Sequence, residues 1–417
     1  MTVARIHTEA ETALFDAFDA ANLSGDGRTA ALDAIKSDGL PTRKVESWHY
    51  TDLRARLKGE FAVAPVPSND DAKVAGAAFP RLASGACVLH FRDGHLVDMG
   101  ERAPDGVTIS HDLPAPFEAN GPDDTVVSLN NAFAQGGVAI AVAPDAQVAQ
   151  TIGLAHTPVA EHAVAAMRCT IAVGESASAN FIERGVGPDG HHYLSNSAIS
   201  LDIAAGATVG YILSNEEGDA AQRLARLSVR MGEKSTLNLF VLNAGSALTR
   251  QEIDFAVDGE GAELVINGIN LVGDEAHIDV TSRITHTMPG CTAEETFRNV
   301  CTDRGVGVFQ GQINVAQAAQ QTDARMACNT LLLSDDCEFN AKPELEIFAD
   351  DVQCAHGATV TDLEESYLFY LRSRGISEAE ARRMLIKAFV AETMDGMDEE
   401  IAGALEGRID SWMERHI

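Results

Sequence analysis

The chain has 417 residues, of which 62 are acidic and 31 are basic, so its formal net charge at pH 7 is −31. This charge repels nucleic-acid phosphates and anionic membrane surfaces, and neither is an expected partner. The length predicts two or three structural units. Aromatic residues make up only 6% of the chain while glycine occupies 35 positions, a composition typical of many short strands joined by small-residue turns.

The N-terminal sequence lacks the apolar run of a signal peptide, and no later window reaches the roughly 20 apolar residues of a membrane span. We therefore expect a cytoplasmic protein. The seven cysteines are odd in number and widely scattered. This pattern indicates reduced thiols rather than a disulfide framework or a C-x-x-C site.

Residues 1–80 are predicted to form an N-terminal helical region that ends in a linker. Apolar residues recur at helical spacing over residues 9–23 and 29–37. An aromatic segment around Trp48 follows, and we expect its aromatic side chains to pin the helices to the next unit. The stretch from Pro65 to Asp71 is rich in Pro, Ser, Asn and Asp, as linkers are.

Residues 81–356 are predicted to form a parallel β-helix core. Small-residue turn patches begin at Gly174, Ala205, Gly232 and Gly259, roughly 27 to 31 residues apart, and each precedes a strand-like run. A solenoid adds one coil per repeat and gives this spacing, so the pattern favours a β-helix over a sandwich. The fold class is mainly β, flanked by helices.

Residues 357–417 are predicted to be helical. Thr361 begins one capping box and Ser377 a second. The second predicted helix carries an apolar stripe at i, i+3, i+4, i+7, i+8, formed by Ala381, Met384, Leu385, Ala388 and Phe389. A third helix carries Ile401, Leu405, Ile409 and Trp412.

Three short motifs carry little functional weight. The segment from Gly232 to Thr236 resembles a phosphate loop only superficially, because Glu233 precedes the lysine where that loop has glycine. The pair His191-His192 follows a glycine-rich stretch and is interpreted as part of an exposed loop. His277 and Asp279 fall on one face of a strand, interpreted as an ordinary polar face without a functional role.

Cys354 and His356 are the clearest candidate ligands. If residues 352–356 form a final strand, two residues that are two positions apart project from the same face and could bind one soft metal or cluster. The pair is only half a site, because zinc and iron–sulfur clusters take four ligands, so the others must come from distant strands or another subunit. On residue type alone, a buried free cysteine beside a hydrogen-bonded histidine is the favoured interpretation.

Several motifs around this pair carry a family resemblance. They are Lys342 to Ile347, Ala349 to Val352, Cys354 to Val360 and Leu368 to Ile376. The similarity extends upstream through residues 309–313, 320–324 and 329–334, and recurs weakly at residues 46–52. Together they resemble the SufB/SufD family of iron–sulfur cluster assembly proteins. The length, the Trp-x-Tyr-Thr-Asp pattern and Cys-Ala-His-Gly are similar to the SufD branch.

The resemblance implies a right-handed parallel β-helix flanked by helices, and a non-catalytic scaffold subunit of the SUF complex. This subunit pairs with SufB, docks the ATPase SufC and contributes to iron acquisition and nascent cluster formation at the SufB interface. It implies no cofactor stably bound by the isolated chain, and a cluster held only transiently between subunits. Whether the free chain is a monomer or a homodimer stays open.

The resemblance also assigns residues. His356 matches the histidine that faces a SufB cysteine at the cluster or iron site, and Cys354 is its neighbour in the motif. The region that docks SufC matches the predicted helix after Thr361, with contacts expected from exposed members of Tyr367, Phe369, Tyr370 and Arg372. Ala355 and Thr361 depart from the family pattern, where Ser and Gly are expected, and both changes are small.

An enzyme is the alternative class. Parallel β-helices often host polysaccharide-cleaving chemistry, but fold analogy is the sole support for that activity here. Carboxylates are so abundant that no acid/base pair can be nominated. The few aromatics and the missing secretion signal argue against a polysaccharide-active enzyme.

Overall fold

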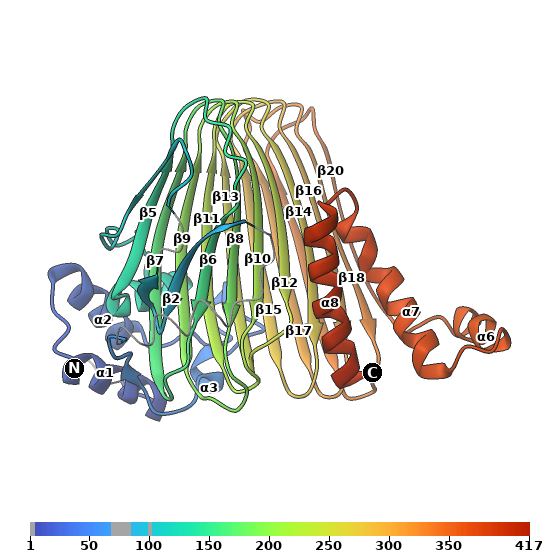
Figure 1. Cartoon of the computed structure of the whole chain (residues 1–417), viewed down its shortest axis with the longest axis horizontal. Coiled ribbons are helices and arrows are strands. Elements are labelled where there is room, and N and C mark those ends of the chain that lie inside the picture. Colours follow the sequence, from blue (N-terminus) through green and yellow to red (C-terminus); the bar gives the residue numbers. More distant parts are fainter. Residues whose placement is uncertain (1–4, 68–84, 99–101) are drawn as a thin grey trace.

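The computed structural model describes residues 5–67, 85–98 and 102–417. It is a parallel β-solenoid with helices packed at its N-terminal and C-terminal ends, which confirms the predicted architecture (Figure 1). The predicted linker residues 68–71 and the predicted boundary at residue 80 lie outside the described residues. No helix among the described residues is long and apolar enough to cross a membrane.

Two sheets form the walls of the solenoid. Sheet A contains β4 (Val107–Ser110), β5 (Gly136–Val142), β7 (Ala163–Val173), β9 (Leu194–Ile203), β11 (Gln222–Met231), β13 (Leu248–Val257), β15 (His277–His286), β17 (Val306–Val315) and β19 (Glu338–Ile347), with β1 (Ala62–Val63) beside β7. Sheet B contains β3 (His95–Asp98), β2 (Cys87–Arg92), β6 (Ile152–Thr157), β8 (Ser178–Val186), β10 (Thr208–Glu216), β12 (Thr236–Asn243), β14 (Glu263–Val272), β16 (Thr292–Cys301), β18 (Asp323–Leu332) and β20 (Gln353–Thr361). From β5 to β20 every second strand of the chain is a neighbour in its sheet, so one coil contributes one strand to each wall.

The repeating turn patches of the sequence stack on one another along one ridge. Each contains a residue with positive φ, namely Ser176 (56°), Gly206 (67°), Lys234 (51°) and Gly261 (66°). The Ser176 N–H donates to the carbonyl of Ala205 in the next coil at 2.9 Å, and the Gly206 N–H donates to that of Glu233 at 2.7 Å. Because the Lys234 patch joins strands β11 and β12, it lacks the strand-to-helix setting of a phosphate loop.

The lumen between the sheets is filled by side chains from alternate strand positions. Leu239, Ile253, Ile266 and Phe297 are among its fully buried members. The strands are parallel and in register, so each inward residue stacks on the inward residue of the next coil. Burial of one such side chain contributes about 1.5–3 kcal/mol, and the repeat makes this contribution coil after coil.

The N-terminal helices cover the outer face of sheet A. They are α1 (Glu9–Ala20), α2 (Asp26–Asp38), η1 (Glu46–Trp48) and α3 (Leu53–Arg56), joined later in the chain by η2 (Gly121–Asp124) and α5 (Thr125–Phe133). The Thr8 side chain caps α1 in a capping box with Glu11. Trp48 is fully buried in the cluster that joins these helices to the sheet, which confirms the expected role of the aromatic segment.

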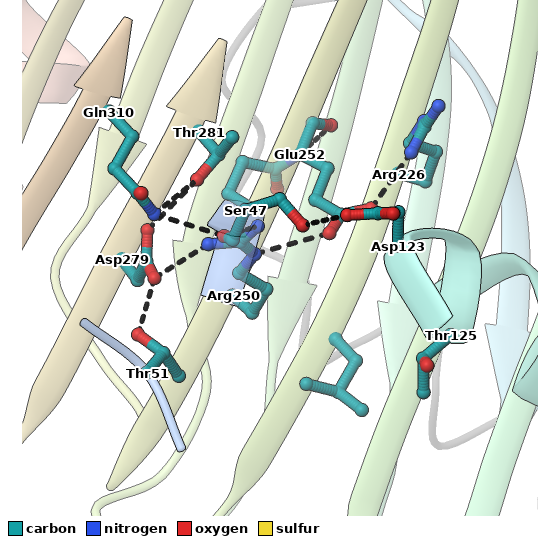
Figure 2. Close-up of polar contacts among 12 residues, drawn as sticks. Ser47, Thr51, Asp123, Thr125, Arg226, Arg250, Glu252, Asp279, Thr281 and Gln310 are labelled. Carbon is teal, nitrogen blue, oxygen red and sulfur yellow. Dashed lines mark hydrogen bonds and ion pairs between the residues drawn. The ribbon is translucent and has the colours of Figure 1, made fainter. Parts of the chain in front are cut away.

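Residues 46–52 clamp onto sheet A through a buried network of charged and polar groups (Figure 2). The fully buried Arg250 guanidinium donates to Asp279 at 2.6 Å, to Glu252 at 3.2 Å and to the carbonyl of Ser47 at 2.8 Å. Its guanidinium carbon also lies 4.3 Å from the centre of the Trp48 ring. Three partners therefore compensate for the removal of this cation from water.

Thr51 extends the clamp by one coil. Its hydroxyl donates to Asp279 and lies 2.7 Å from Nε2 of His277. Both residues are buried, so interpreting them as an ordinary polar face was wrong. The reason is tertiary, because a segment more than 200 positions earlier in the chain covers that face.

The C-terminal helices are α6 (Glu365–Ser373), α7 (Glu378–Ala391), η3 (Glu392–Met394) and α8 (Glu399–His416). The predicted capping box at Thr361 is wrong. Thr361 is the last residue of β20 and still pairs with Leu331 of β18, and the N-cap of α6 is Glu364. Ser377 caps α7 as predicted. Sheet pairing therefore overrides the local helix signal at Thr361.

Helix α7 and helix α8 pack on the outer face of sheet B. Leu405, Ile409 and Trp412 of α8 are buried there as predicted. The predicted stripe of α7 is partly wrong, because Met384 is 44% exposed whereas Ile386 and Val390 are buried. The sheet surface selects the face with the β-branched residues, which is rotated from the face that spacing favoured.

Replacing Arg250 with leucine tests the clamp. Arg250→Leu leaves the buried Asp279 without its arginine, whereas Glu252 keeps its ion pair with Arg226, so we expect a loss of about 3–5 kcal/mol in the free energy of unfolding. Urea unfolding followed by circular dichroism measures the loss. The control is Arg230→Leu, which removes an arginine with a 71% exposed side chain from a surface pair with Asp202, and we expect less than about 1 kcal/mol. Equal losses in the two variants would contradict a structural role for the clamp.

Candidate functional site at the open end of the solenoid

No described segment of the chain adds a further coil to the C-terminal end of the solenoid. Strands β19 and β20 are the last strands of sheets A and B, and among the described residues no further strand pairs with their outer edges. The lumen core comes to the surface between them, where the partly buried Phe339, Leu345 and Val352 pack against it. Phe348, in the connection between the two strands, is 67% exposed.

Cys354 and His356 lie in β20 and face the lumen side of sheet B. Cys354 is opposite Ala324 and His356 is opposite Met326, both buried lumen residues of β18. This register confirms that the two side chains project from one face. Cys354 is half-buried, and desolvation raises the pKa of its thiol. His356 is exposed because no further coil covers it, so the interpretation as a buried structural pair does not describe it.

The two side chains could supply at most half of the ligands of a metal site. Among the described residues, neither belongs to a group of three potential ligands whose atoms lie within 4.8 Å of one another. The other ligands of a four-coordinate ion or cluster would have to arrive from outside this part of the chain. His191 and His192, in the loop between β8 and β9, lie far along the chain in a separate turn, as predicted.

The free edges of β19 and β20 differ in chemistry. In a parallel sheet the N–H groups of alternate residues point to opposite sides of the strand. The N–H of Gln353 donates to the carbonyl of Thr322 in the preceding coil, so the N–H groups of Cys354, His356, Ala358 and Val360 point to the open edge. The only ionisable side chains of β20 are the Cys354 thiol and the His356 imidazole.

Strand β19, in contrast, is protected. The N–H of Glu338 donates to the carbonyl of Gly305, so the N–H groups of the odd-numbered residues of β19 point to the open edge. One of these positions is Pro343, which has no N–H group. Lys342, Glu344 and Glu346 add charge to the same strand. Proline and charged residues are the usual means of blocking an edge, so β20 is the edge left open to strand addition.

The clamp reaches this end of the molecule. Glu46, in the N-terminal segment, forms an ion pair with Lys342 of β19. Gln310 of β17 donates to the carbonyl of Ser47 at 3.1 Å (Figure 2). The N-terminal segment therefore stabilises the last coils from outside, whereas the lumen side of β20 stays accessible.

A buried carboxyl group lies beneath His356 on the same inner row. Register pairs Glu295 with Met326, and Met326 with His356, so the carboxyl group is two strands below the imidazole. Glu295 is fully buried, and desolvation raises its pKa to about 7, an effect that the Ser282 hydroxyl only partly offsets. Cys328 is in the same part of the lumen, and burial raises the pKa of its thiol to about 12.

Helix α6 carries the second candidate surface. Tyr367, Phe369 and Tyr370 are all exposed, with Phe369 at 75%. The guanidinium carbon of Arg374 lies 5.0 Å from the centre of the Tyr370 ring, and the exposed Arg372 pairs with Glu378 at 3.3 Å. Helix α6 contributes no buried residue and extends away from the solenoid beyond α7 (Figure 1).

Sequence reasoning missed Glu295 and Phe348. Period-two alternation in residues 292–301 places Glu295 on the same face as Ala293 and Phe297, a signal of a buried acid that could have been noticed. Phe348 gives no such signal, because its exposure follows from the absence of another coil.

Comparisons with known proteins agree with the motif resemblance. A family model described as "SUF system FeS cluster assembly, SufBD core domain" matches residues 156–389. The chain is 31% identical to the iron-sulfur cluster assembly protein SufD of Escherichia coli (strain K12) over 88% of each chain. It is 25% identical to a SufBD family iron-sulfur cluster assembly protein of Synechocystis over 92% of this chain and 88% of the relative. It is also 25% identical to SufB of Bacillus subtilis, over 71% of this chain and 64% of the relative. The resemblance to the SufD branch is confirmed.

The raised pKa of Glu295 predicts a pH-dependent stability. A carboxyl group that binds its proton more tightly when folded contributes most below its unfolded pKa of about 4.5, and this contribution is lost as pH rises to about 7. Glu295→Gln removes this titration, so the variant should gain stability relative to the parent between pH 5 and pH 8, by at most about 3 kcal/mol. Thermal unfolding across this range measures the difference.

The matched control is Glu294→Gln, because Glu294 is the exposed neighbour of Glu295. Its stability difference from the parent should not change with pH. A difference for Glu295→Gln that is equally independent of pH would refute the raised pKa.

Proposed function

Because the chain belongs to the SufBD family of SUF-system iron–sulfur cluster assembly proteins, we propose that it is a non-catalytic scaffold subunit of the SUF complex. In this role it pairs with SufB and docks the ATPase SufC, contributing to iron acquisition and nascent cluster formation. The observation that carries the proposal is the open edge of β20, which holds Cys354 and His356 beside an uncovered core.

Pairing through β20 is supported by the chemistry of its edge. Four outward N–H groups, from Cys354 to Val360, alternate with carbonyl groups that have no partner strand among the described residues. An added strand supplies those hydrogen bonds, while the uncovered apolar side chains around Leu345 supply a hydrophobic contact. A related β-solenoid subunit with its own open end would meet both needs.

The cluster site is proposed at that interface. His356 and Cys354 offer an imidazole and a thiol, both suited to iron, and the partner completes the ligand set. The cluster is cargo in transit, so the isolated chain holds no cofactor stably. The raised pKa of the Cys354 thiol keeps it protonated in the free chain, and a bound cation would favour the thiolate.

Docking of the ATPase is proposed on α6. Its exposed aromatic residues, Tyr367, Phe369 and Tyr370, and the cation of Arg372 have the composition of interface anchors. Helix α6 contacts α7, and α7 packs on the outer face of sheet B. A force applied to α6 would reach the coils that end at β20 through this packing.

Replacing Ala358 with proline tests the pairing. Ala358→Pro removes an N–H group that points to the open edge and leaves the hydrogen bonds to β18 in place. The variant should stay folded but lose co-purification with a SufB partner by at least about tenfold, a loss of roughly 1.4 kcal/mol or more. Ala358→Val keeps the N–H group and serves as the control. Equal partner binding by the two variants would rule out strand addition at this edge.

Replacing His356 with alanine tests the cluster site. His356→Ala should leave the complex with SufB and SufC intact, because an exposed side chain contributes little to the fold. Cluster formation in cells that depend on this system should fall severalfold, measured by the activity of an iron–sulfur enzyme. His192→Ala, at an exposed histidine in a distant turn, should change neither property. Unchanged cluster formation in His356→Ala would remove His356 from the site.

A further inference from the structure

A cluster of possible metal ligands lies on a different part of the molecule, where the turns of two coils meet the end of α8. Asp274, in the turn between β14 and β15, Asp303, in the turn between β16 and β17, and His416 each offer one ligand atom, and these atoms lie within 4.8 Å of one another. We propose that these three residues bind a divalent first-row transition-metal ion.

The separation of the ligand atoms suits such an ion. Nδ1 of His416 is 3.3 Å from Oδ2 of Asp303. Two ligands that are each about 2.1 Å from one ion and subtend a tetrahedral or slightly smaller angle lie roughly 3.3 Å apart. An ion can therefore enter between these atoms with little movement of the two residues.

The backbone holds the two aspartates at equivalent places in successive coils. Both adopt left-handed conformations, with φ of 51° for Asp274 and 55° for Asp303. The N–H of Asp274 donates to Oδ2 of Asp303 at 3.0 Å, which orients that carboxylate. The solenoid repeat therefore fixes the spacing of the carboxylates before any ion binds.

Packing holds the imidazole in place. The His416 side chain is only 10% exposed, and its ring lies 4.7 Å from that of Trp412 in a tilted stack. The ring also lies close to Gly273, where an added Cβ would come within 2.6 Å of Nδ1. A histidine that served only as a surface ion-pair partner would not need this close support, whereas a metal ligand gains affinity when its orientation is preset.

The set of donors selects the class of ion. Imidazole suits iron, zinc, nickel and copper, whereas magnesium and calcium prefer sites made of oxygen alone.

The surroundings of the site leave it accessible to a cation. The positive charge of Arg304, beside the site, is balanced by its ion pair with Glu275. Asp274 and His416 line a groove of about 1230 Å³ along the turns that lead from sheet B to sheet A, and the groove gives an ion access from solvent. A bound ion would tie α8 to two coils.

Tryptophan fluorescence gives a direct test. The chain has two tryptophans: Trp412 stacks on His416, and Trp48 is buried in the N-terminal cluster. Titration of the full chain, without a polyhistidine tag, with Co²⁺ should quench part of the fluorescence with saturation, and Zn²⁺ should reverse this quenching by competition. Mg²⁺ at the same concentrations should not.

Asp303→Asn and Asp274→Asn should each weaken the apparent Co²⁺ affinity at least tenfold, with melting curves confirming that both variants are folded. Asp336→Asn, at an exposed acidic residue in the turn of the next coil, is the matched control and should bind like the parent. The absence of saturable quenching in the parent, or equal quenching in all three variants, would overturn the site. Competition by Mg²⁺ as strong as that by Zn²⁺ would overturn the assignment to transition metals.

Discussion

In-register stacking of one coil on the next is the interaction on which the rest of this structure depends. Backbone hydrogen bonds join each coil to its neighbours, and the lumen side chains stack in continuous rows. Such a stack satisfies every interior coil but leaves the outermost coils with one unsatisfied side. The candidate interface is the C-terminal side of this stack, and its unpaired N–H groups and uncovered apolar side chains are the groups that interior coils bury.

Charges inside this structure are tolerated where several partners converge. Arg250 has two carboxylates, a carbonyl group and an aromatic ring. Within the lumen, Arg223 likewise pairs with Glu183 at 2.9 Å and Glu217 at 2.8 Å. Glu295 has no such cation among the residues that the structure describes, and it instead binds its proton more tightly. The two outcomes follow from one rule, because a buried charge must be compensated or neutralised.

The sequence predicted those features that arise from local repetition. The spacing of the turn patches predicted the solenoid, and period-two alternation placed Cys354 and His356 on one face. Features that depend on distant contacts were missed or wrong. His277 and Asp279 are buried by Thr51, more than 200 positions away, and Thr361 stays in a strand because β18 pairs with it. The buried face of α7 was decided by the surface of sheet B rather than by its own apolar spacing.

The N-terminal margins of both sheets have a different character. Sheet A ends with β4, antiparallel to β5, and sheet B ends with β3, antiparallel to β2, so in the described part of the chain neither margin continues the parallel pattern of the coils. The two ends of the described solenoid therefore present different surfaces. The proposed association through β20 would join two subunits at their C-terminal ends, whereas a solenoid with the same pairing surface at both ends would polymerise into a filament.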